Sequence, residues 1–234
     1  MNVATPLGFD AQAIPIHRVC DDQSALPREF LEPSRIKKYV QSPPIWEPEI
    51  TDENRHVIAA DIISKRQAAG KITQAAVLIP LLMQSNGLTV LLTQRTDHLH
   101  DHAGQISFPG GRIDPGDLGP HDTALRESAE EIGLDRTGVE IIGHLPQYLT
   151  VSGYSVTPVV GLVKPQAEYV LDRFEVADIF EVPLDFLMNP ANHQIRVWQS
   201  DQGSRRFYSM PYENRFIWGA TAGMLRNLYH LLKV

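Results

Sequence analysis

Three glutamates lie close together in the segment ALRESAEEIGL, residues 124–134: Glu127, Glu130 and Glu131. In a helix, residues three and four apart are neighbours on one face, so Glu127 would lie beside both of the others. Like charges at this spacing destabilise a helix by roughly 0.2–0.5 kcal/mol per pair. Two interpretations are open: a site for a divalent cation held by the carboxylates, or a solvated acidic face of the helix.

The neighbouring residues predict where this helix begins and ends. Asp122 or Thr123, which follow the turn-forming GDLGPH, are suited to the N-cap, and Gly133 is suited to the left-handed position after the last turn. Glu130 and Glu131 then lie in the last turn, where the helix dipole disfavours negative charge. A solvated face therefore explains their position poorly.

The segment before the helix, FPGGRIDPGDLG at residues 108–119, is predicted to be a loop. Its Pro-Gly-Gly turn allows the backbone to approach a ligand closely, and the Gly, Pro and Asp residues that follow suit neither a strand nor a helix. Upstream, the apolar run TVLLTQR at residues 89–95 predicts a strand. The chain thus passes from a strand through a glycine turn into a helix with clustered acids.

This arrangement resembles the Nudix hydrolases, whose signature is G-x5-E-x7-R-E-U-x-E-E-x-G-U, with U a bulky aliphatic residue. The second half of the signature is matched by Arg126, Glu127, Glu130, Glu131, Gly133 and Leu134. The first half, counted from Gly111, departs from it. Asp117 takes the acidic position, eight residues rather than seven separate it from Arg126, and Ser128 stands where an aliphatic residue is usual.

The longer spacing is similar to that of one branch, the coenzyme A pyrophosphatases, which carry a second motif, LLTxR[SA]x3Rx3Gx3FPGG. Residues 91–111, LLTQRTDHLHDHAGQISFPGG, match it at Leu91, Leu92, Thr93, Arg95, Gly104 and the whole of FPGG. Two positions depart from the motif, because Thr96 replaces Ser or Ala and His100 replaces Arg. The second change replaces a permanently charged fork of donors by an imidazole.

The resemblance implies an α/β fold, the Nudix-type α/β/α sandwich with a mixed β-sheet. It also implies metal-dependent hydrolysis of a diphosphate bond in coenzyme A or its derivatives, giving 3′,5′-ADP and 4′-phosphopantetheine, with Mg²⁺ or Mn²⁺ as the cofactor. Two alternatives stay open. One is a Nudix hydrolase of ADP-ribose or a dinucleotide polyphosphate, and the other is a non-catalytic Nudix-like binding domain, which would be expected to lack one of the glutamates.

The glutamates are assigned first as metal ligands. Glu127 and Glu131, one helical turn apart, are the primary candidates and Glu130 is the third. The resemblance adds the main-chain carbonyl near Gly111 as a ligand and implies that Arg126 orients a glutamate of the cluster. A surface arginine without a catalytic role is the alternative for Arg126.

Arg95, at the end of a predicted strand, is a candidate to hold a phosphate with its planar fork of donors. Glu175, in FEVADIF, is a candidate for an additional acid that acts as a ligand or as a general base. The other candidates for the substrate site are the motif residues His100, Gly104, Gly110 and Gly111.

His98, His100 and His102 alternate in HLHDH and, if extended, would share one face, which raises a zinc site as an alternative. A loop that borders the substrate explains the segment better, because it lies inside the motif. Cys20 is the only cysteine, so the chain has no internal disulfide and no Cys-rich zinc site. We assign Cys20 no catalytic role.

The composition is typical of a soluble globular protein, with 43% hydrophobic and 21% charged residues among 234. Since no apolar run approaches the roughly 20 residues that span a bilayer and the start does not resemble a signal peptide, we expect a cytoplasmic protein that does not bind membranes. The net charge of −7 argues against nucleic acid as a partner. A small-molecule nucleotide is expected instead, because bound divalent cations would make an acidic pocket attractive to its phosphates. A homodimer is left open.

Residues 1–50 are rich in proline and predict an N-terminal extension, a wrapping arm or linker, before a Nudix domain at residues 51–234. The predicted helices are 34–41, 52–69, a short one at 185–189 and 219–233. The predicted strands are 75–83 and 88–95, joined by the hairpin turn QSNG, then 138–146, 156–163, 177–184 and a hairpin over 196–210 that turns at DQG.

Overall fold

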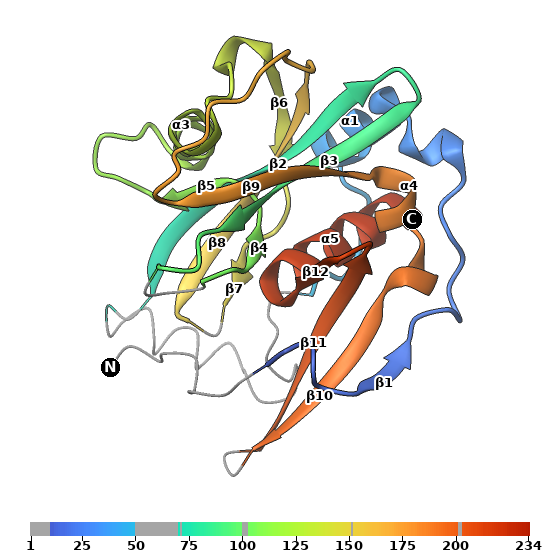
Figure 1. Cartoon of the computed structure of the whole chain (residues 1–234). Helices are drawn as coiled ribbons and strands as arrows, with labels where there is room; N and C mark the ends of the chain where they lie inside the picture. Colours follow the sequence, from blue (N-terminus) through green and yellow to red (C-terminus); the bar gives the residue numbers. More distant parts are fainter. Residues whose placement is uncertain (1–9, 50–69, 71, 100–102, 151, 201–202) are drawn as a thin grey trace.

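The computed structural model describes residues 10–49, 70, 72–99, 103–150, 152–200 and 203–234 (Figure 1). The predicted helix at 52–69, His100, His102 and part of the predicted DQG turn lie outside the described residues. In the described part of the chain, no helix is both long and apolar enough to cross a membrane.

Most of the described strands follow one another in runs of three or four, and helices separate these runs. The strands are β1 (Ile16–Val19), β2 (Thr73–Gln84), β3 (Gly87–Arg95), β4 (Ile106–Ser107), β5 (Gly110–Arg112), β6 (Val139–His144), β7 (Tyr148–Leu149), β8 (Tyr154–Val163), β9 (Val176–Pro183), β10 (Gln194–Ser200), β11 (Gly203–Tyr212) and β12 (Arg215–Trp218). The α-helices are α1 (Pro33–Gln41), α3 (Pro120–Ile132), α4 (Leu184–Leu187) and α5 (Gly219–Lys233), and the 3-10 turns are η1 (Arg28–Leu31), η2 (Arg136–Gly138) and η3 (Pro190–Asn192).

A mixed sheet forms the centre of the molecule, with the strand order β4-β3-β2-β8-β6 and with β9, β5 and β7 paired to β3, β2 and β8. The strands β2 and β8 run parallel, from the pair Thr73–Tyr154 to the pair Leu82–Val163. Their neighbours are antiparallel. Both strands are largely apolar, as expected for parallel strands that are covered on both faces.

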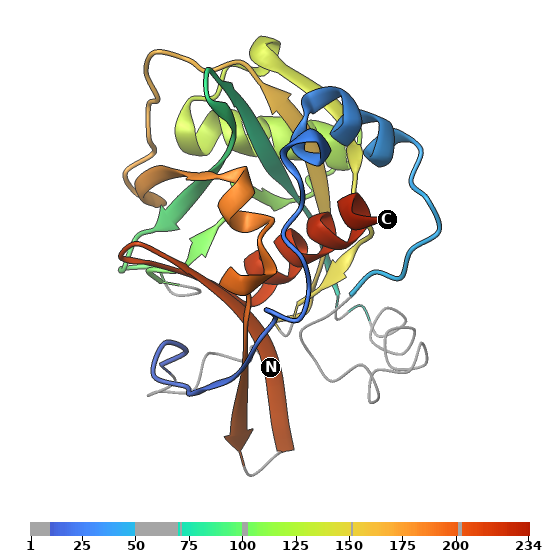
Figure 2. The same cartoon turned by 90° about the vertical axis from the view of Figure 1, so that its right-hand side faces the viewer.

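Helices cover the two faces of this sheet (Figures 1 and 2). Successive side chains of β2 point to opposite faces. Leu78 packs in a cluster with Ala124 and Ile132 of α3, whereas Ile79 packs in a larger cluster with Leu225 of α5. The predicted α/β/α sandwich with a mixed β-sheet is therefore confirmed.

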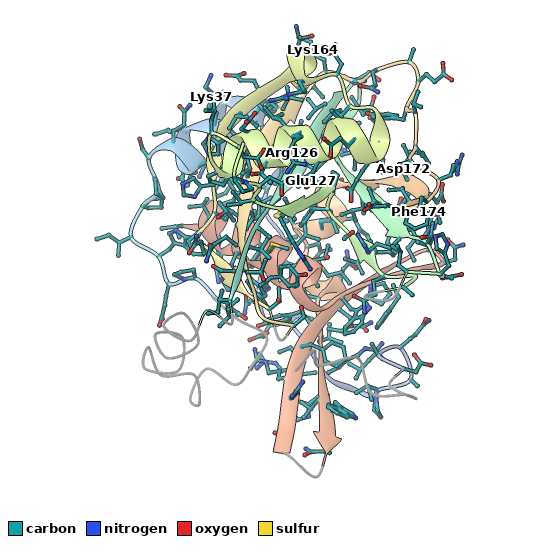
Figure 3. All side chains as sticks on the ribbon, turned by 90° about the vertical axis from the view of Figure 1, so that its left-hand side faces the viewer. Lys37, Arg126, Glu127, Lys164, Asp172 and Phe174 are labelled. Carbon is teal, nitrogen blue, oxygen red and sulfur yellow. The ribbon has the colours of Figure 1, made fainter. Side chains whose placement is uncertain are left out.

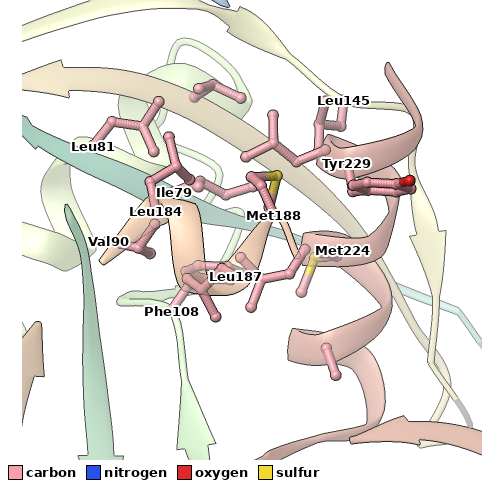
Figure 4. Packing of buried hydrophobic residues seen from close by; sticks show 14 of the residues in the cluster. Ile79, Leu81, Val90, Phe108, Leu145, Leu184, Leu187, Met188, Met224 and Tyr229 are labelled. Atoms are coloured by element: carbon pink, nitrogen blue, oxygen red, sulfur yellow. The ribbon is translucent and has the colours of Figure 1, made fainter. Parts of the chain in front are cut away.

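The larger cluster joins the central sheet to α4 and α5. Figure 4 shows Val90 of β3 and Leu187 of α4 packed near Met224 of α5, and all three side chains are buried. Burial of apolar surface stabilises a fold by about 25 cal/mol per Å². This cluster therefore fixes the sheet against the C-terminal helix.

A second, antiparallel sheet, in the order β1-β10-β11-β12, packs against α5. Ile195, Met210 and Ile217 of this sheet belong to the larger cluster. The hairpin of β10 and β11 extends away from the body of the molecule (Figure 1). It confirms the hairpin predicted over 196–210, with strands slightly longer than predicted.

Residues 10–49 pack onto the same core. The strand β1 pairs with β10, and Ile36 and Val40 of α1 are buried in the larger cluster. The main-chain N–H of Glu49 donates to Asn227 Oδ1 at 2.8 Å, and Asn227 Nδ2 donates back to the Glu49 carbonyl at 2.6 Å. Figure 2 shows this blue segment passing across the face of the molecule that carries α5. Residues 10–49, called the wrapping arm below, thus pack around the core.

The helix α3 begins at Pro120, earlier than predicted, so the N-cap assigned to Asp122 or Thr123 was wrong. Gly119 is the N-cap residue, and Pro120 at the first helical position has the fixed φ that a helix start requires. The predicted end is confirmed, because Gly133 has φ 64°, in the left-handed region.

The prediction of a loop over the whole of residues 108–119 was also wrong in one place. The segment Gly110–Arg112 forms β5, antiparallel to residues 75–77 of β2. A Cβ on Gly110 would lie 2.4 Å from the Ala76 carbonyl oxygen, and Gly110 has φ +154°. Only glycine allows the two backbones to approach so closely.

Candidate active site

The glutamate-bearing side of α3 lies directly against β5. The main-chain N–H of Gly110 donates to Glu131 Oε2 at 3.0 Å. A Cβ on Gly111 would lie 2.5 Å from the carboxylate carbon of Glu127. The glycine turn and the helix, which the sequence predicted as neighbours along the chain, therefore bring two carboxylates together over a bare stretch of backbone.

Glu131 is only 5% exposed. Burial raises its pKa to about 8, although the hydrogen bond from Gly110 and the charge of Arg95 act in the opposite direction. The charges of Glu127 and Glu175 raise it further. A carboxyl group in this environment favours its protonated form near neutral pH unless a cation is present.

Glu127 is also largely buried, with 18% of its side chain exposed. Burial raises its pKa, the ion pair with Arg126 Nη1 at 2.9 Å lowers it, and the charges of Glu130 and Glu175 raise it again. Two carboxyl groups whose ionisation is opposed by burial thus lie in one place. Such a pair has the chemistry of a cation site.

Arg126 is held by Asp117, the residue displaced by one position from the family signature. Its Nε and Nη2 contact Asp117 Oδ1 and Oδ2 at 2.8 and 2.9 Å. Thr123 Oγ1 donates to the same carboxylate at 2.7 Å, and these contacts hold the pKa of Asp117 well below its usual range, Arg126 being the main cause. The loop between β5 and α3 therefore absorbs the extra residue while the acidic group still reaches the arginine.

Glu130 lies differently from its two neighbours. Its side chain is 61% exposed and its Oε2 lies 3.1 Å from Arg126 Nη1. Among the described residues, no three His, Cys, Asp or Glu side chains converge on one point as a ready-made metal cluster. The available donors are the carboxylates of Glu127 and Glu131 and the adjacent backbone, a set of oxygens that fits Mg²⁺ or Mn²⁺ together with phosphate.

Arg95 lies at the end of β3, where its main-chain N–H donates to the Gln105 carbonyl at 2.9 Å. Its Nε is buried and has no hydrogen-bond partner within the described part of the chain. Its charge reaches Glu131, whose pKa it lowers. A half-buried arginine beside the glutamates, with an unused buried Nε donor, is suited to an anionic group.

Glu175 precedes β9 and is tied to the end of β3, because Thr96 N–H donates to its carbonyl at 3.0 Å. Its charge raises the pKa values of both Glu127 and Glu131. The loop before β9 is also fixed to α3, since the Asp172 N–H donates to the Glu131 carbonyl at 2.9 Å. Figure 3 shows Asp172 and Phe174 on the same face of the molecule as Arg126 and Glu127.

The remaining predicted residues take varied places. Gly104 has φ +68°, and a Cβ there would lie 2.7 Å from Asp97 Oδ1, so the motif glycine serves a tight turn. His98 is exposed and contacts the ring of Phe174, with centroids 5.0 Å apart. Cys20 is buried in the larger cluster, on the opposite face of the sheet from α3.

The sequence alone did not select Asp172 or Phe174. Their proximity to the site depends on contacts between residues distant along the chain, Asp172 with Glu131 and Phe174 with Thr96. One signal was available, because Phe174 directly precedes the candidate Glu175 in a polar stretch.

Residues 72–199 match the NUDIX domain. The chain is similar to proteins named uncharacterized Nudix hydrolase NudL from Yersinia pestis (strain Pestoides F) and Yersinia pseudotuberculosis (serotype O:1b), each 42% identical over 155 residues, 66% of this chain and 77% of the relative. Among solved structures, it is similar to the M. smegmatis Nudix hydrolase RenU, with 24% identity, 48% of this chain and 71% of that chain covered, and a TM-score of 0.42. The contacts of β5 with Glu127 and Glu131 of α3 agree with the matched domain. The chain therefore belongs to the Nudix hydrolase family.

Proposed function

We propose that this chain hydrolyses a diphosphate bond of coenzyme A or one of its derivatives, giving 3′,5′-ADP and 4′-phosphopantetheine. The observation that carries the hydrolase is the pairing of Glu127 and Glu131 over the backbone of Gly110 and Gly111. Here two largely buried carboxylates lie against the backbone of two glycines, which have no side chains to obstruct a ligand.

Glu127 and Glu131 would hold Mg²⁺ or Mn²⁺, with Glu130 and the main-chain carbonyl near Gly111 as further ligands. The raised pKa values of the two buried carboxyls support this assignment, because a cation would favour their ionised form. When bound, the cation supplies positive charge for the diphosphate and acidifies water.

The other residues position groups or move protons. Arg126, fixed by Asp117, holds the Glu127 carboxylate through its Nη1. Arg95 offers its unused Nε to a phosphate oxygen. Glu175 is the additional acid, as a ligand or as the base that accepts a proton from water. The oxygen of that water bonds to one phosphorus, the bond from this phosphorus to the bridging oxygen breaks, and two phosphate monoesters leave.

The coenzyme A assignment depends on the motif between Leu91 and Gly111. Of that motif, Arg95 is close enough to Glu131 to lower its pKa, and the two glycines of the FPGG turn contact Glu131 and Glu127. ADP-ribose and dinucleotide polyphosphates remain the alternative substrates. His100, which is assigned to substrate binding from the sequence, lies outside the described residues.

A substrate panel tests this proposal. The purified protein, with Mg²⁺ or Mn²⁺, is incubated separately with coenzyme A, ADP-ribose and a dinucleotide polyphosphate, and the products are identified by mass. We expect 3′,5′-ADP and 4′-phosphopantetheine at the highest kcat/KM. A Glu131→Gln protein purified in parallel controls for contaminating hydrolases, and a higher kcat/KM for either of the other substrates would refute the coenzyme A assignment.

A further inference from the structure

An exposed aromatic pair borders the candidate active site. Phe174 is 66% exposed, and it is the only aromatic residue among the exposed large hydrophobic residues of the described chain. Its ring meets the imidazole of His98 in an edge-to-face contact, with centroids 5.0 Å apart and an interplanar angle of 61°. An edge-to-face contact covers at most one face of the Phe174 ring, so the other face of this exposed side chain is available to another planar group.

Hydrogen bonds fix the backbone of Phe174 relative to the site. Its N–H donates to Asp172 Oδ1 at 2.9 Å, and the Asp172 N–H donates to the Glu131 carbonyl at 2.9 Å. Thr96 Oγ1 donates to the Phe174 carbonyl at 2.8 Å, and the next residue, Glu175, is bonded to Thr96 N–H. The backbone of Phe174 is therefore held between the last turn of α3, which carries Glu131, and the end of β3.

We propose that Phe174, together with His98, stacks against the adenine base of the nucleotide whose diphosphate binds at Glu127 and Glu131. Phe174 lies on the same face of the molecule as Glu127 (Figure 3), and the ring of His98 contacts it. Base stacking on an aromatic side chain contributes enough to affinity to explain why an apolar ring is kept in solvent. This inference rests on one part of the proposed function, namely that the diphosphate of a nucleotide binds at Glu127 and Glu131.

The base is preferred over the pantetheine arm for two reasons. A planar base contacts the whole face of a phenyl ring, whereas a flexible chain of single bonds contacts only part of it. In addition, the exposed carboxylates of Asp97 and Asp172 flank the pair in sequence. Carboxylates are acceptors only and match the exocyclic amino group of adenine, which is a donor.

Equilibrium binding by calorimetry tests the inference with AMP, ribose 5-phosphate and 4′-phosphopantetheine as probes, in the presence of Mg²⁺. AMP and ribose 5-phosphate differ only in the base. In Phe174→Leu we expect AMP binding to weaken roughly five- to one-hundred-fold, while ribose 5-phosphate and 4′-phosphopantetheine stay within about twofold. Phe174→Trp should retain AMP affinity, since it keeps an aromatic face.

Val170→Ala is the matched control, because Val170 is 70% exposed in the same loop but is not aromatic. It should leave AMP binding unchanged. Equal losses for AMP and ribose 5-phosphate in Phe174→Leu, a selective loss for 4′-phosphopantetheine, or no loss at all would each overturn the inference. Failure of coenzyme A hydrolysis would remove the proposed substrate but not this result, because AMP is common to adenine nucleotides.

Discussion

Two features of Glu131 shift its pKa in opposite directions when no cation is bound. It is buried, and its Oε2 accepts a hydrogen bond from the Gly110 N–H, which favours the ionised form. Burial nevertheless prevails and raises its pKa to about 8. Ionising this buried group without a cation beside it would lower the stability of the fold. We therefore expect the binding of a divalent cation to be coupled to the stability of the whole molecule.

Replacing Glu131 by Gln should abolish turnover while keeping the fold. The amide retains the shape of the side chain but removes the charge that would hold the cation, so kcat should fall roughly 10²–10³-fold or more, the size of loss seen when one electrostatic stabiliser is removed. The increase in Tm that Mg²⁺ gives the wild type should also disappear. Steady-state kinetics and thermal unfolding with and without Mg²⁺ measure both effects.

Glu130→Gln is the matched comparison on the same helix, because the Glu130 side chain is 61% exposed. We expect a smaller loss of kcat and a preserved Mg²⁺ effect on Tm. Glu131→Gln activity within about tenfold of wild type at saturating Mg²⁺ would contradict the assignment of this residue as a ligand.

The residues of the candidate site could be predicted to the extent that they are local in sequence. The glutamates are neighbours on one helix, and the glycines are separated from that helix by fewer than ten residues, so their spacing predicted that they would lie close together. The environment of Phe174 could not be predicted, because it depends on hydrogen bonds between distant parts of the chain, from Thr96 to Phe174 and from Asp172 to Glu131. The extra residue before Arg126 changed the spacing but not the contact with Asp117, since a loop can absorb one residue.

At the scale of elements, β5 depends on two adjacent glycines for different reasons. Gly110 has φ +154° and faces the backbone of β2, whereas Gly111 faces the Glu127 side chain. A backbone contact cannot move without disturbing the sheet, but the end of a side chain can rotate away. The two positions should therefore respond differently to the same substitution.

Gly110→Ala should destabilise the fold, and Gly111→Ala should mainly reduce activity. In the first variant the new Cβ would lie 2.4 Å from the Ala76 carbonyl oxygen, so we expect a loss of roughly 1–3 kcal/mol or more in the free energy of unfolding. In the second, the Cβ displaces the Glu127 carboxylate and lowers kcat with a smaller change in stability. Urea unfolding and kinetics separate the two, and equal stability losses would contradict this account.

The wrapping arm contributes to the core through α1. Ile36 is fully buried, so Ile36→Ala should lower the free energy of unfolding by about 2–5 kcal/mol. Ile45, in the same arm, is fully exposed, with 101% relative exposure, and Ile45→Ala should change it by less than about 0.5 kcal/mol. Chemical denaturation measures both. A similar effect of the two substitutions would indicate that the arm does not stabilise the fold.

The sequence predicted the helix α1 but not its partner. The apolar positions of a short helix indicate a buried face, but they do not indicate which surface covers it. Here that surface includes Ile142 and Leu145 around β6, more than one hundred residues later in the chain. For the same reason β1, a strand of four residues, was not predicted, since it forms only by pairing with β10.

At the scale of the whole molecule, a buried polar network joins the arm, the second sheet and α5. Arg226 Nη1 contacts His193 Nδ1 at 2.9 Å, and Nη2 donates to Gln23 Oε1 at 2.8 Å. An arginine can only donate, so His193 Nδ1 accepts and its Nε2 donates to the Leu187 carbonyl at 2.7 Å. This arrangement requires a neutral imidazole.

The periodicity of the strands and of α5 predicted most of the architecture, because apolar patterns report which face is buried. Apolar patterns do not indicate which polar side chains are hydrogen-bonded to one another in the interior. Gln23, His193 and Arg226 are far apart in the sequence, and no short-range pattern connects them. The network is therefore a property of the complete fold, and its contribution is best measured through the stability of the complete chain.

His193 gives the network a dependence on pH. Its side chain is fully buried, and burial, aided by the charge of Arg226, lowers its pKa to about 4 despite the hydrogen bond to Leu187. In the unfolded chain a histidine titrates near pH 6.5. Below that value the unfolded state takes up a proton that the folded state does not bind until about pH 4. The stability contributed by neutral His193 is therefore complete above pH 6.5 and is lost progressively as the pH falls toward 4.

We expect the free energy of unfolding of the wild type to fall between pH 6.5 and 4 by up to roughly 3 kcal/mol from this residue alone. His193→Gln should be less stable at pH 7.5, because the fit of the hydrogen bonds is disturbed, but its stability should fall less steeply over the same range. The difference between the two proteins, measured by urea unfolding at a series of pH values, isolates His193 from the carboxyl groups that titrate in the same interval. Parallel profiles would show that protonation of His193 is not linked to folding.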